Sequence, residues 1–377
     1  MRAGAFLYPW DVVDDPAAPG RLASLGLDRI TLAAAYHSTR AVTPRHPRHR
    51  IVTAEYAAVL YPPDPARWRG RALAPYPAGG WAPGDAFGAA AEALAGAASE
   101  VHSWVVLAHN SRLGAEHPET SVVNAHGDRY PWAPCIAQDP VRAFLVDLAA
   151  EAAVRPGAAG TELESCGWYG LAHLHAHDKT GGLPAGPDAQ YLMSLCFCPA
   201  CRTGYGERGA DPDELAAAVR AALEPAWRGG PAAPLPAPLA DAALAHRLAT
   251  ARTFQEAAVT AVRAAAPPGF RVLLHADPTP HHTGANPGTD PSHVLTLADG
   301  VVTPASHIPA FAPHTRPGTT LAANLPVVHA LGATPHTLTT DAHRAARQGA
   351  TELSLYHAGL ASDTDLKAVR EALAALR

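Results

Sequence analysis

The sequence of 377 residues predicts an α/β fold, a single (β/α)8 barrel with an insertion after its fourth strand. Three observations predict this fold. Short β-rich runs alternate with alanine-rich helical runs, which is the pattern of parallel strands joined by crossover helices. Eight such strand runs occur, the strand number of this barrel. The chain is also long enough to bury the core of one large barrel.

The predicted strands are short, mostly apolar runs that end in turn-forming or polar residues. In chain order they span residues 3–10, 28–38, 102–111, 160–168, 270–278, 298–304, 318–328 and 350–359. Residues 1–377 are therefore assigned to one barrel.

The predicted helices are alanine-rich or amphipathic. An alanine-rich helix is expected at 87–98, and an amphipathic helix at 140–153, with Asp139 as its cap and Pro140 in its first turn. A long helical region follows over 211–266, interrupted by a Pro/Ala/Gly-rich loop at 228–238. We expect residues 196–245 to form an extended helical insertion in the barrel. The helix at 363–377 closes the chain.

Composition and charge argue against several partners. The formal net charge is only −5, which gives no electrostatic footprint for nucleic acid or for an anionic membrane. Two prolines interrupt the basic run at 44–50, which predicts a loop. The N-terminal apolar run is too short for a signal peptide, and no stretch of about 20 apolar residues predicts a membrane span. We expect a cytoplasmic protein with reduced thiols, and its assembly into a homo-oligomer is left open.

Polar and aromatic residues gather at the predicted carboxyl ends of the strands, where (β/α)8 enzymes place their chemistry. We expect the substrate to bind at this rim. The rim residues are Tyr8, Trp10, Asp11, Tyr36, His37, Arg40, His109, Asn110, Glu162, Glu164, Trp168, His275, Asp277, Tyr356 and His357. Trp168 and Tyr169 could form a wall on which a sugar stacks, or could simply pack.

Three of the five cysteines fall within six residues, in the pattern C-x-C-x-x-C formed by Cys196, Cys198 and Cys201. Zinc prefers four ligands in a tetrahedron, so a fourth thiolate is expected from Cys135 or Cys166. A site closed by four thiolates leaves no position for water and is structural. Unliganded buried thiols are the alternative, but they rarely pack this closely.

This region resembles the bacterial β-galactosidases of glycoside hydrolase family 42, which are (β/α)8 barrels with a cysteine zinc site. In that family a C-x-C-x-x-C follows the strand that carries the acid/base glutamate, and one more cysteine lies upstream. The resemblance covers about residues 108–206 and implies that Cys135 is the fourth ligand.

The sequence also departs from the family. Leu163 stands where the family has Asn before its acid/base Glu, and residues 319–328 hold no carboxylate for the strand-seven nucleophile. The resemblance therefore implies a distant relative that shares the barrel and the zinc site. It does not imply the family's substrate or its retaining mechanism.

Two carboxylates on the fourth strand suit glycoside chemistry. Glu162 and Glu164 lie two residues apart, so both side chains point into the barrel. His275 and Asp277 repeat this arrangement on the next strand. Glycoside cleavage uses one carboxyl group to protonate the leaving oxygen and a second to attack or to activate water. We assign Glu164 as the acid and Asp277 as its partner. Glu162 either raises the pKa of Glu164 or is structural.

A histidine-rich segment at 173–179 supports a rival interpretation. His173, His175 and His177 could share one face and bind a catalytic metal, or His175 could line a polar sugar pocket. No nucleotide-binding motif and no nucleophile elbow occurs in the sequence. The sequence therefore predicts a glycosidase that acts on a small carbohydrate or glycoside. A metal-dependent barrel hydrolase or isomerase and a non-catalytic sugar-binding barrel are the alternatives.

Overall fold

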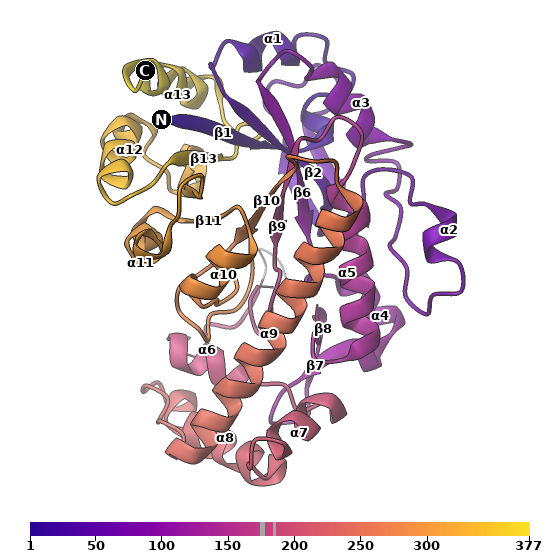
Figure 1. The fold of residues 1–377 in the computed structure, drawn as a ribbon, viewed down its shortest axis with the longest axis vertical. Coiled ribbons are helices and arrows are strands. Elements are labelled where there is room, and N and C mark those ends of the chain that lie inside the picture. Colours follow the sequence, from indigo (N-terminus) through magenta and orange to yellow (C-terminus); the bar gives the residue numbers. More distant parts are fainter. Residues whose placement is uncertain (174–177, 184–185) are drawn as a thin grey trace.

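The computed structural model describes residues 1–173, 178–183 and 186–377, and parallel strands within these ranges form a closed barrel (Figure 1). In spatial order the barrel strands are β1 (Arg2–Leu7), β2 (Arg29–Tyr36), β6 (Glu100–Val106), β9 (Gly160–Glu164), β10 (Arg271–His275), β11 (Gly300–Pro304), β12 (Thr320–Pro326) and β13 (Glu352–Tyr356). The barrel closes because β1 pairs in parallel with both β2 and β13. The predicted (β/α)8 fold is confirmed, and each predicted strand run overlaps one of these strands.

Helices surround the strands, and the two ends of the chain lie near each other beside β1 and β13 (Figure 1). Helices of the outer ring and its loops are α1 (Ala18–Ala23), α2 (Pro65–Trp68), α3 (Ala86–Ala93), α4 (Ser111–Glu116), α5 (Asp139–Ala153), α9 (Ala237–Ala265), α10 (Pro291–Leu297), α11 (Ile308–Phe311), α12 (Leu338–Arg347) and α13 (Asp363–Ala375). Short strands add the hairpins β3 (Thr39–Val42) with β4 (Ile51–Ala54) and β7 (Ser121–Val123) with β8 (Arg129–Pro134), and β5 (Ala58–Val59) beside β2.

A helical extension lies between β9 and β10. Its helices α6 (Pro187–Met193), α7 (Pro199–Gly206) and α8 (Pro212–Trp227) gather at the end of α9 that points away from the barrel (Figure 1). The long helix α9 packs along α5, and its amino-terminal part contacts α7. Extension and barrel therefore share one continuous helix. Within the described ranges, no helix is long and apolar enough to cross a membrane.

Two helix ends differ from those expected from the sequence. Helix α5 begins at Asp139, so that Gln138 takes the cap position with extended backbone and Asp139 lies in the first turn. The predicted helix at 87–98 ends at Ala93, and the chain then turns through Gly96, whose φ is +88°. Glycine adopts this left-handed conformation without the steric penalty of a β-carbon, which explains the early end.

The sheet separates two hydrophobic cores. The outer core lies between strands and helices and is mostly aliphatic and alanine-rich. The inner core fills the barrel and is rich in aromatic side chains, among them Phe6, Tyr8 and Trp104. The rings of Phe6 and Trp104 lie 4.8 Å apart, and Tyr8 stacks on His357 at 4.4 Å. Tyr8 and Trp104 also line a cavity at the carboxyl ends of the strands.

Charged residues fill the opposite, amino-terminal end of the barrel. The buried guanidinium of Arg29 contacts Glu352 and donates to Ser354 Oγ at 3.2 Å, and its Nε lies 3.3 Å from Glu162 Oε1. Arg271 Nη2 lies 3.1 Å from Glu352 Oε1. A buried charge is tolerated when oppositely charged partners surround it. This network holds strands β2, β9, β10 and β13 in register beneath the cavity.

Candidate active site and cysteine cluster

A cavity of about 400 Å³ opens at the carboxyl ends of the barrel strands. Seven residues that the sequence placed at the rim line it together: Tyr8, Tyr36, His37, Arg40, Glu164, His275 and Tyr356. They come from β2, β9, β10 and β13 and from the segments after β1 and β2, so the closed barrel brings them together. The remaining lining residues are Thr39, Ala41, Trp104, His173, Ala285, Asn286, Asn324, Leu331 and Leu360.

Glu164 is the carboxylate among these lining residues. It is buried, and its Oε2 accepts a hydrogen bond of 2.8 Å from the indole Nε1 of Trp104. His275 Nδ1 lies 3.9 Å from the same oxygen. Burial raises the pKa of Glu164, and Glu162 adds to the rise, while His275 and Trp104 oppose it. A carboxyl group with a raised pKa keeps its proton nearer to neutral pH, which suits a proton donor.

Glu162 lies on the same face of β9, deeper in the barrel and outside the cavity lining. Thr31 Oγ1 donates to its Oε1 at 2.7 Å, and His275 Nε2 lies 3.2 Å from its Oε2. Burial alone would raise the pKa of Glu162, but the Arg29 guanidinium, His275 and Thr31 lower it to about 2. Glu162 therefore stays ionised at neutral pH, and because a carboxylate can only accept, His275 Nε2 donates to it.

The lowered pKa of Glu162 makes stability depend on pH. Its ordinary pKa of 4.5 falls to about 2 on folding, so its contribution is complete above about pH 4.5 and is lost as pH falls toward 2. Glu162→Gln should lower the free energy of unfolding by about 3–5 kcal/mol at pH 7, because it leaves Arg29 less well compensated. Urea unfolding from pH 7 to pH 3 checks this. The difference in unfolding free energy between the wild type and Glu162→Gln should narrow as the pH falls. The control variant Glu371→Gln, at an exposed position, should unfold with the free energy of the wild type at every pH. A difference that stays constant with pH would contradict stabilisation of the fold by ionised Glu162.

Three tyrosines line the cavity near Glu164. The Tyr8 hydroxyl donates to the Tyr36 hydroxyl at 3.1 Å, and Tyr356 lies on the neighbouring strand β13. Burial raises the pKa values of Tyr8, Tyr36 and Tyr356, so they stay neutral phenols. Neutral phenols donate and accept hydrogen bonds, and their rings give a flat apolar wall. The wall suits a ligand with both hydroxyl groups and apolar faces.

Asp277 lies in a different cavity from Glu164. This second cavity, of about 320 Å³, is lined by Pro187, Gln190, Tyr191, Asp277, Thr279, His281, His282, Thr283 and His307. Asp277 Oδ1 accepts from the Thr279 backbone N at 2.7 Å, and its Oδ2 lies 3.3 Å from His307 Nδ1 and 3.7 Å from His282 Nδ1. The structure thus does not bring Glu164 and Asp277 into one cavity.

Seven other predicted site residues within the described part of the chain lie outside the lining of the Glu164 cavity, and four of them have clear structural surroundings. Asn110 accepts from the Leu113 backbone N at 3.0 Å and caps helix α4. Trp168 donates from Nε1 to the Arg247 carbonyl at 3.0 Å, beneath helix α9. His357 is fully buried, and burial lowers its pKa to about 3. Asp11 accepts from the Tyr8 backbone N at 2.8 Å, and burial raises its pKa to about 7.

Trp10 stacks on Tyr8 at 4.6 Å and lines a third cavity of about 250 Å³ beside Trp81. Tyr169 and His109 stack on each other at 4.1 Å. His175 and His177 lie outside the described residues. Tyr169 and His109 pack beside His173, which lines the Glu164 cavity, so these two predicted site residues lie next to that cavity.

Sequence reasoning missed several polar groups of the Glu164 cavity, among them Trp104 and Asn324. Trp104 donates to Glu164, yet a tryptophan within an apolar strand is usual core packing and gives no separate signal. Asn324 is the polar residue that β12, the seventh barrel strand, presents to the cavity. Its Oδ1 is buried and has no hydrogen-bond partner within the described part of the chain. Its place near the carboxyl end of a predicted strand could have marked it.

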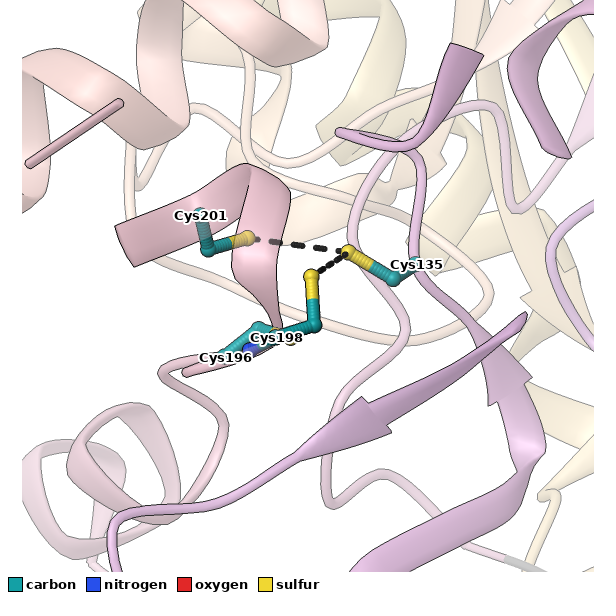
Figure 2. A group of neighbouring side chains, drawn as sticks. All are labelled: Cys135, Cys196, Cys198 and Cys201. Atoms are coloured by element: carbon teal, nitrogen blue, oxygen red, sulfur yellow. Dashed lines mark hydrogen bonds between the residues drawn. The ribbon is translucent and has the colours of Figure 1, made fainter. Parts of the chain in front are cut away.

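Four cysteines form a buried cluster that could hold a metal ion (Figure 2). Cys135 follows β8, Cys196 and Cys198 precede α7, and Cys201 lies within α7. The Cys135 Sγ lies 3.6 Å from the Sγ atoms of both Cys198 and Cys201, and all four ligand atoms lie within 4.8 Å of one another. Bonds of about 2.3 Å from a tetrahedral zinc ion to sulfur would give S···S separations of about 3.8 Å.

The backbone around Cys196 also suits metal binding. The backbone N atoms of Val123 and Cys198 each donate to Cys196 Sγ at 3.4 Å, which stabilises a thiolate. Cys166 is buried elsewhere, and burial raises its pKa. The cluster therefore contains Cys135, as the resemblance implied, and not Cys166.

No family model and no curated protein sequence matches this chain. Solved structures with a similar fold include the glycoside hydrolase domain of PgaB (BpsB) from Bordetella bronchiseptica, with 13% identity and a TM-score of 0.61 over 99% of this chain and 98% of that one. α-L-Fucosidase isoenzyme 2 from Paenibacillus thiaminolyticus is 13% identical with a TM-score of 0.60, over 100% of this chain and 49% of its own.

A family 42 β-galactosidase from G. stearothermophilus is 12% identical, with a TM-score of 0.58 over 100% of this chain and 56% of that one. The chain thus spans about half the length of two of these enzymes. At such low identities the likeness shows the fold. The distant resemblance to family 42 is confirmed at that level, and the chain is a (β/α)8 barrel similar to those of several glycoside hydrolases.

Proposed function

We propose that this protein is a glycoside hydrolase-like enzyme in which Glu164 donates a proton to the leaving oxygen of a small glycoside. The observation that carries the proposal is Glu164 itself, a buried carboxyl group with a raised pKa at the carboxyl end of the fourth barrel strand. It borders a cavity large enough for a small sugar. The glycoside hydrolases with similar folds support the same reaction class.

The surroundings of Glu164 suit proton donation. The Trp104 indole and His275 position its carboxyl group between them, and burial favours the protonated form. When the proton leaves, the indole N–H remains as a donor to the new carboxylate, which offsets part of the cost of a buried charge. Tyr8, Tyr36 and Tyr356 can hold the sugar by hydrogen bonds and by contact with its apolar face.

Glycoside cleavage also needs a group that attacks the sugar or activates a water, and the residues that line the cavity are candidates for this role. Asn324 lies where the seventh strand reaches the cavity, and an amide can orient a hydroxyl group or a water but cannot act as a carboxylate nucleophile. Asp277 remains the sequence-based candidate, although it lines the neighbouring cavity. We expect Asp277→Asn to lower kcat less than Glu164→Gln does.

We also propose that the cysteine cluster holds one structural zinc ion. Four buried thiols with separations near those of a zinc tetrathiolate support this role. A bound zinc would tie the segment after β8 to helix α7 and so hold the extension against the barrel. Four protein ligands leave no open position on the ion, so this site takes no part in the reaction.

A screen of nitrophenyl glycosides, including fucosides and galactosides, tests the proposed activity. Because the proton comes from Glu164 and not from a metal-bound water, turnover of the cleaved glycoside should survive incubation with EDTA. Loss of turnover with EDTA, restored by added zinc or manganese, would replace this reaction by metal-dependent hydrolysis. Binding of glycosides without any turnover would instead support a sugar-binding barrel.

A further inference from the structure

Three histidines converge at the side of the Glu164 cavity. His37 follows β2, His109 follows β6 and His173 lies in the segment after β9. Strands β2, β6 and β9 are consecutive neighbours in the barrel, so their carboxyl-terminal segments lie together. The ligand nitrogens of the three rings all lie within 4.8 Å of one another. We propose that these three imidazoles form a site for a divalent transition-metal ion of the zinc class, separate from the cysteine cluster.

Hydrogen bonds orient two of the rings for metal binding. His37 Nδ1 lies 2.8 Å from the Ser38 carbonyl oxygen, which can only accept, so Nδ1 carries the proton and Nε2 keeps its lone pair. The Tyr169 hydroxyl donates to the His173 carbonyl at 3.1 Å, so its oxygen can accept the proton of His173 Nε2 at 3.4 Å. His173 Nδ1 is then the ligand nitrogen. Such partners of the second ring nitrogen are usual for metal-binding histidines.

Aromatic packing fixes the planes of the rings. His37 stacks on Tyr36 at 4.2 Å, and His109 stacks on Tyr169 at 4.1 Å. The rings of His37 and His109 lie 4.6 Å apart, and His173 meets His109 nearly at right angles, at 5.5 Å and 87°. Three rings held in this way present their nitrogens from different directions, which is what a tetrahedral ion requires.

Charge at the site suits a cation. The ligand atoms of the site are ring nitrogens, which bind a metal ion through a lone pair. Asp178 interacts electrostatically with His173, so its carboxylate adds negative potential to the site. The site thus combines three imidazole ligands with a nearby negative charge.

The ligand set selects the class of ion. Imidazole nitrogens favour zinc, cobalt, nickel and copper, whereas magnesium and calcium prefer oxygen. Bonds of about 2.0–2.1 Å to a tetrahedral ion place nitrogens about 3.3 Å apart, so binding would draw the rings closer by up to about 1.5 Å. His37 and His173 both line the Glu164 cavity, so the fourth position would face that cavity and could take water or a ligand oxygen.

Cobalt binding tests the site without any measurement of activity. The full-length protein is dialysed against a mild chelator and titrated with Co²⁺, followed by visible absorption and by elemental analysis. We expect the wild type to bind one more equivalent of cobalt than His109→Ala. The difference spectrum between the two proteins should show bands of nitrogen and oxygen ligation, without the thiolate charge transfer that cobalt in the cysteine cluster would give. Loss of one ligand should weaken binding by at least about 100-fold, since changes to residues beyond the ligands cost 10–100-fold.

Matched variants keep the test decisive. His343 is an exposed histidine on α12, and His343→Ala should bind cobalt like the wild type. His173→Ala, at an exposed position, repeats the test should His109→Ala fail to fold. Equal cobalt binding by wild type and a folded His109→Ala or His173→Ala would overturn the proposal. Because the readout is the difference between variants, it depends neither on the cysteine cluster nor on the glycosidase activity.

Discussion

Glu164→Gln is expected to lower kcat by about 10²–10⁴-fold on a glycoside with a poor leaving group, the usual contribution of general acid catalysis. The amide cannot supply the proton that the leaving oxygen needs. Its carbonyl oxygen can still accept the hydrogen bond from Trp104 Nε1, so the side chain should keep its place in the barrel. Steady-state kinetics of the two proteins on the same glycoside measure the effect.

Thermal unfolding serves as the control that Glu164→Gln still folds. The melting temperature of Glu164→Gln should match or exceed that of the wild type, because the substitution removes a buried group whose ionised form is costly. Glu162→Gln should lower kcat less, since Glu162 lies outside the cavity lining and acts only through His275. Turnover of Glu164→Gln near that of the wild type would remove Glu164 from the mechanism.

Cys198→Ser is expected to remove one equivalent of zinc from the purified protein and to lower the melting temperature by about 5–10 °C. The hydroxyl is a poor zinc ligand, and loss of the ion would release the link between the segment after β8 and helix α7. The expected shift corresponds to about 4–8 kcal/mol of lost stability in a chain of 377 residues. Elemental analysis and thermal unfolding measure the two effects.

Cys166→Ser is the matched control, because it also places a hydroxyl where a fully buried thiol was, outside the cluster. It should keep the metal while showing the cost of the buried hydroxyl alone. Wild-type protein purified without chelator and free of zinc would contradict the structural zinc. Zinc retained in full by Cys198→Ser would exclude that cysteine as a ligand.

The strands could be predicted because the barrel needs buried runs at regular places, and these runs are visible in the sequence. The alternation that turns Glu162 and Glu164 inward also holds, because both lie within the regular strand β9. The same rule fails to place Asp277 beside Glu164. Strand β10 ends at His275, and Asp277 instead forms an isolated bridge with Gly288 and turns into a second cavity. The alternation of side chains along a strand predicts where a residue points only while the backbone stays extended.

Contacts between distant segments could not be predicted from local pattern. The cysteine spacing alone left both Cys135 and Cys166 open as the fourth cysteine, and only the resemblance to family 42 favoured Cys135. The fold places Cys135 near the others because β8 ends beside α7. The cluster of His37, His109 and His173 likewise joins segments that are distant in the sequence, so local pattern did not predict it. The alternating histidines at 173–179 drew attention to their own segment, whereas His173 meets His37 and His109 from neighbouring barrel strands.

The most direct test of Glu164 as proton donor is the dependence of turnover on the leaving group. Wild-type protein and Glu164→Gln are compared on a series of aryl glycosides with the same sugar and leaving phenols of increasing pKa. We expect the deficit of Glu164→Gln to be small for a dinitrophenol, which leaves without protonation, and to grow toward about 10²–10⁴-fold for a poor leaving group. A deficit that is equal across the series would contradict proton donation by Glu164.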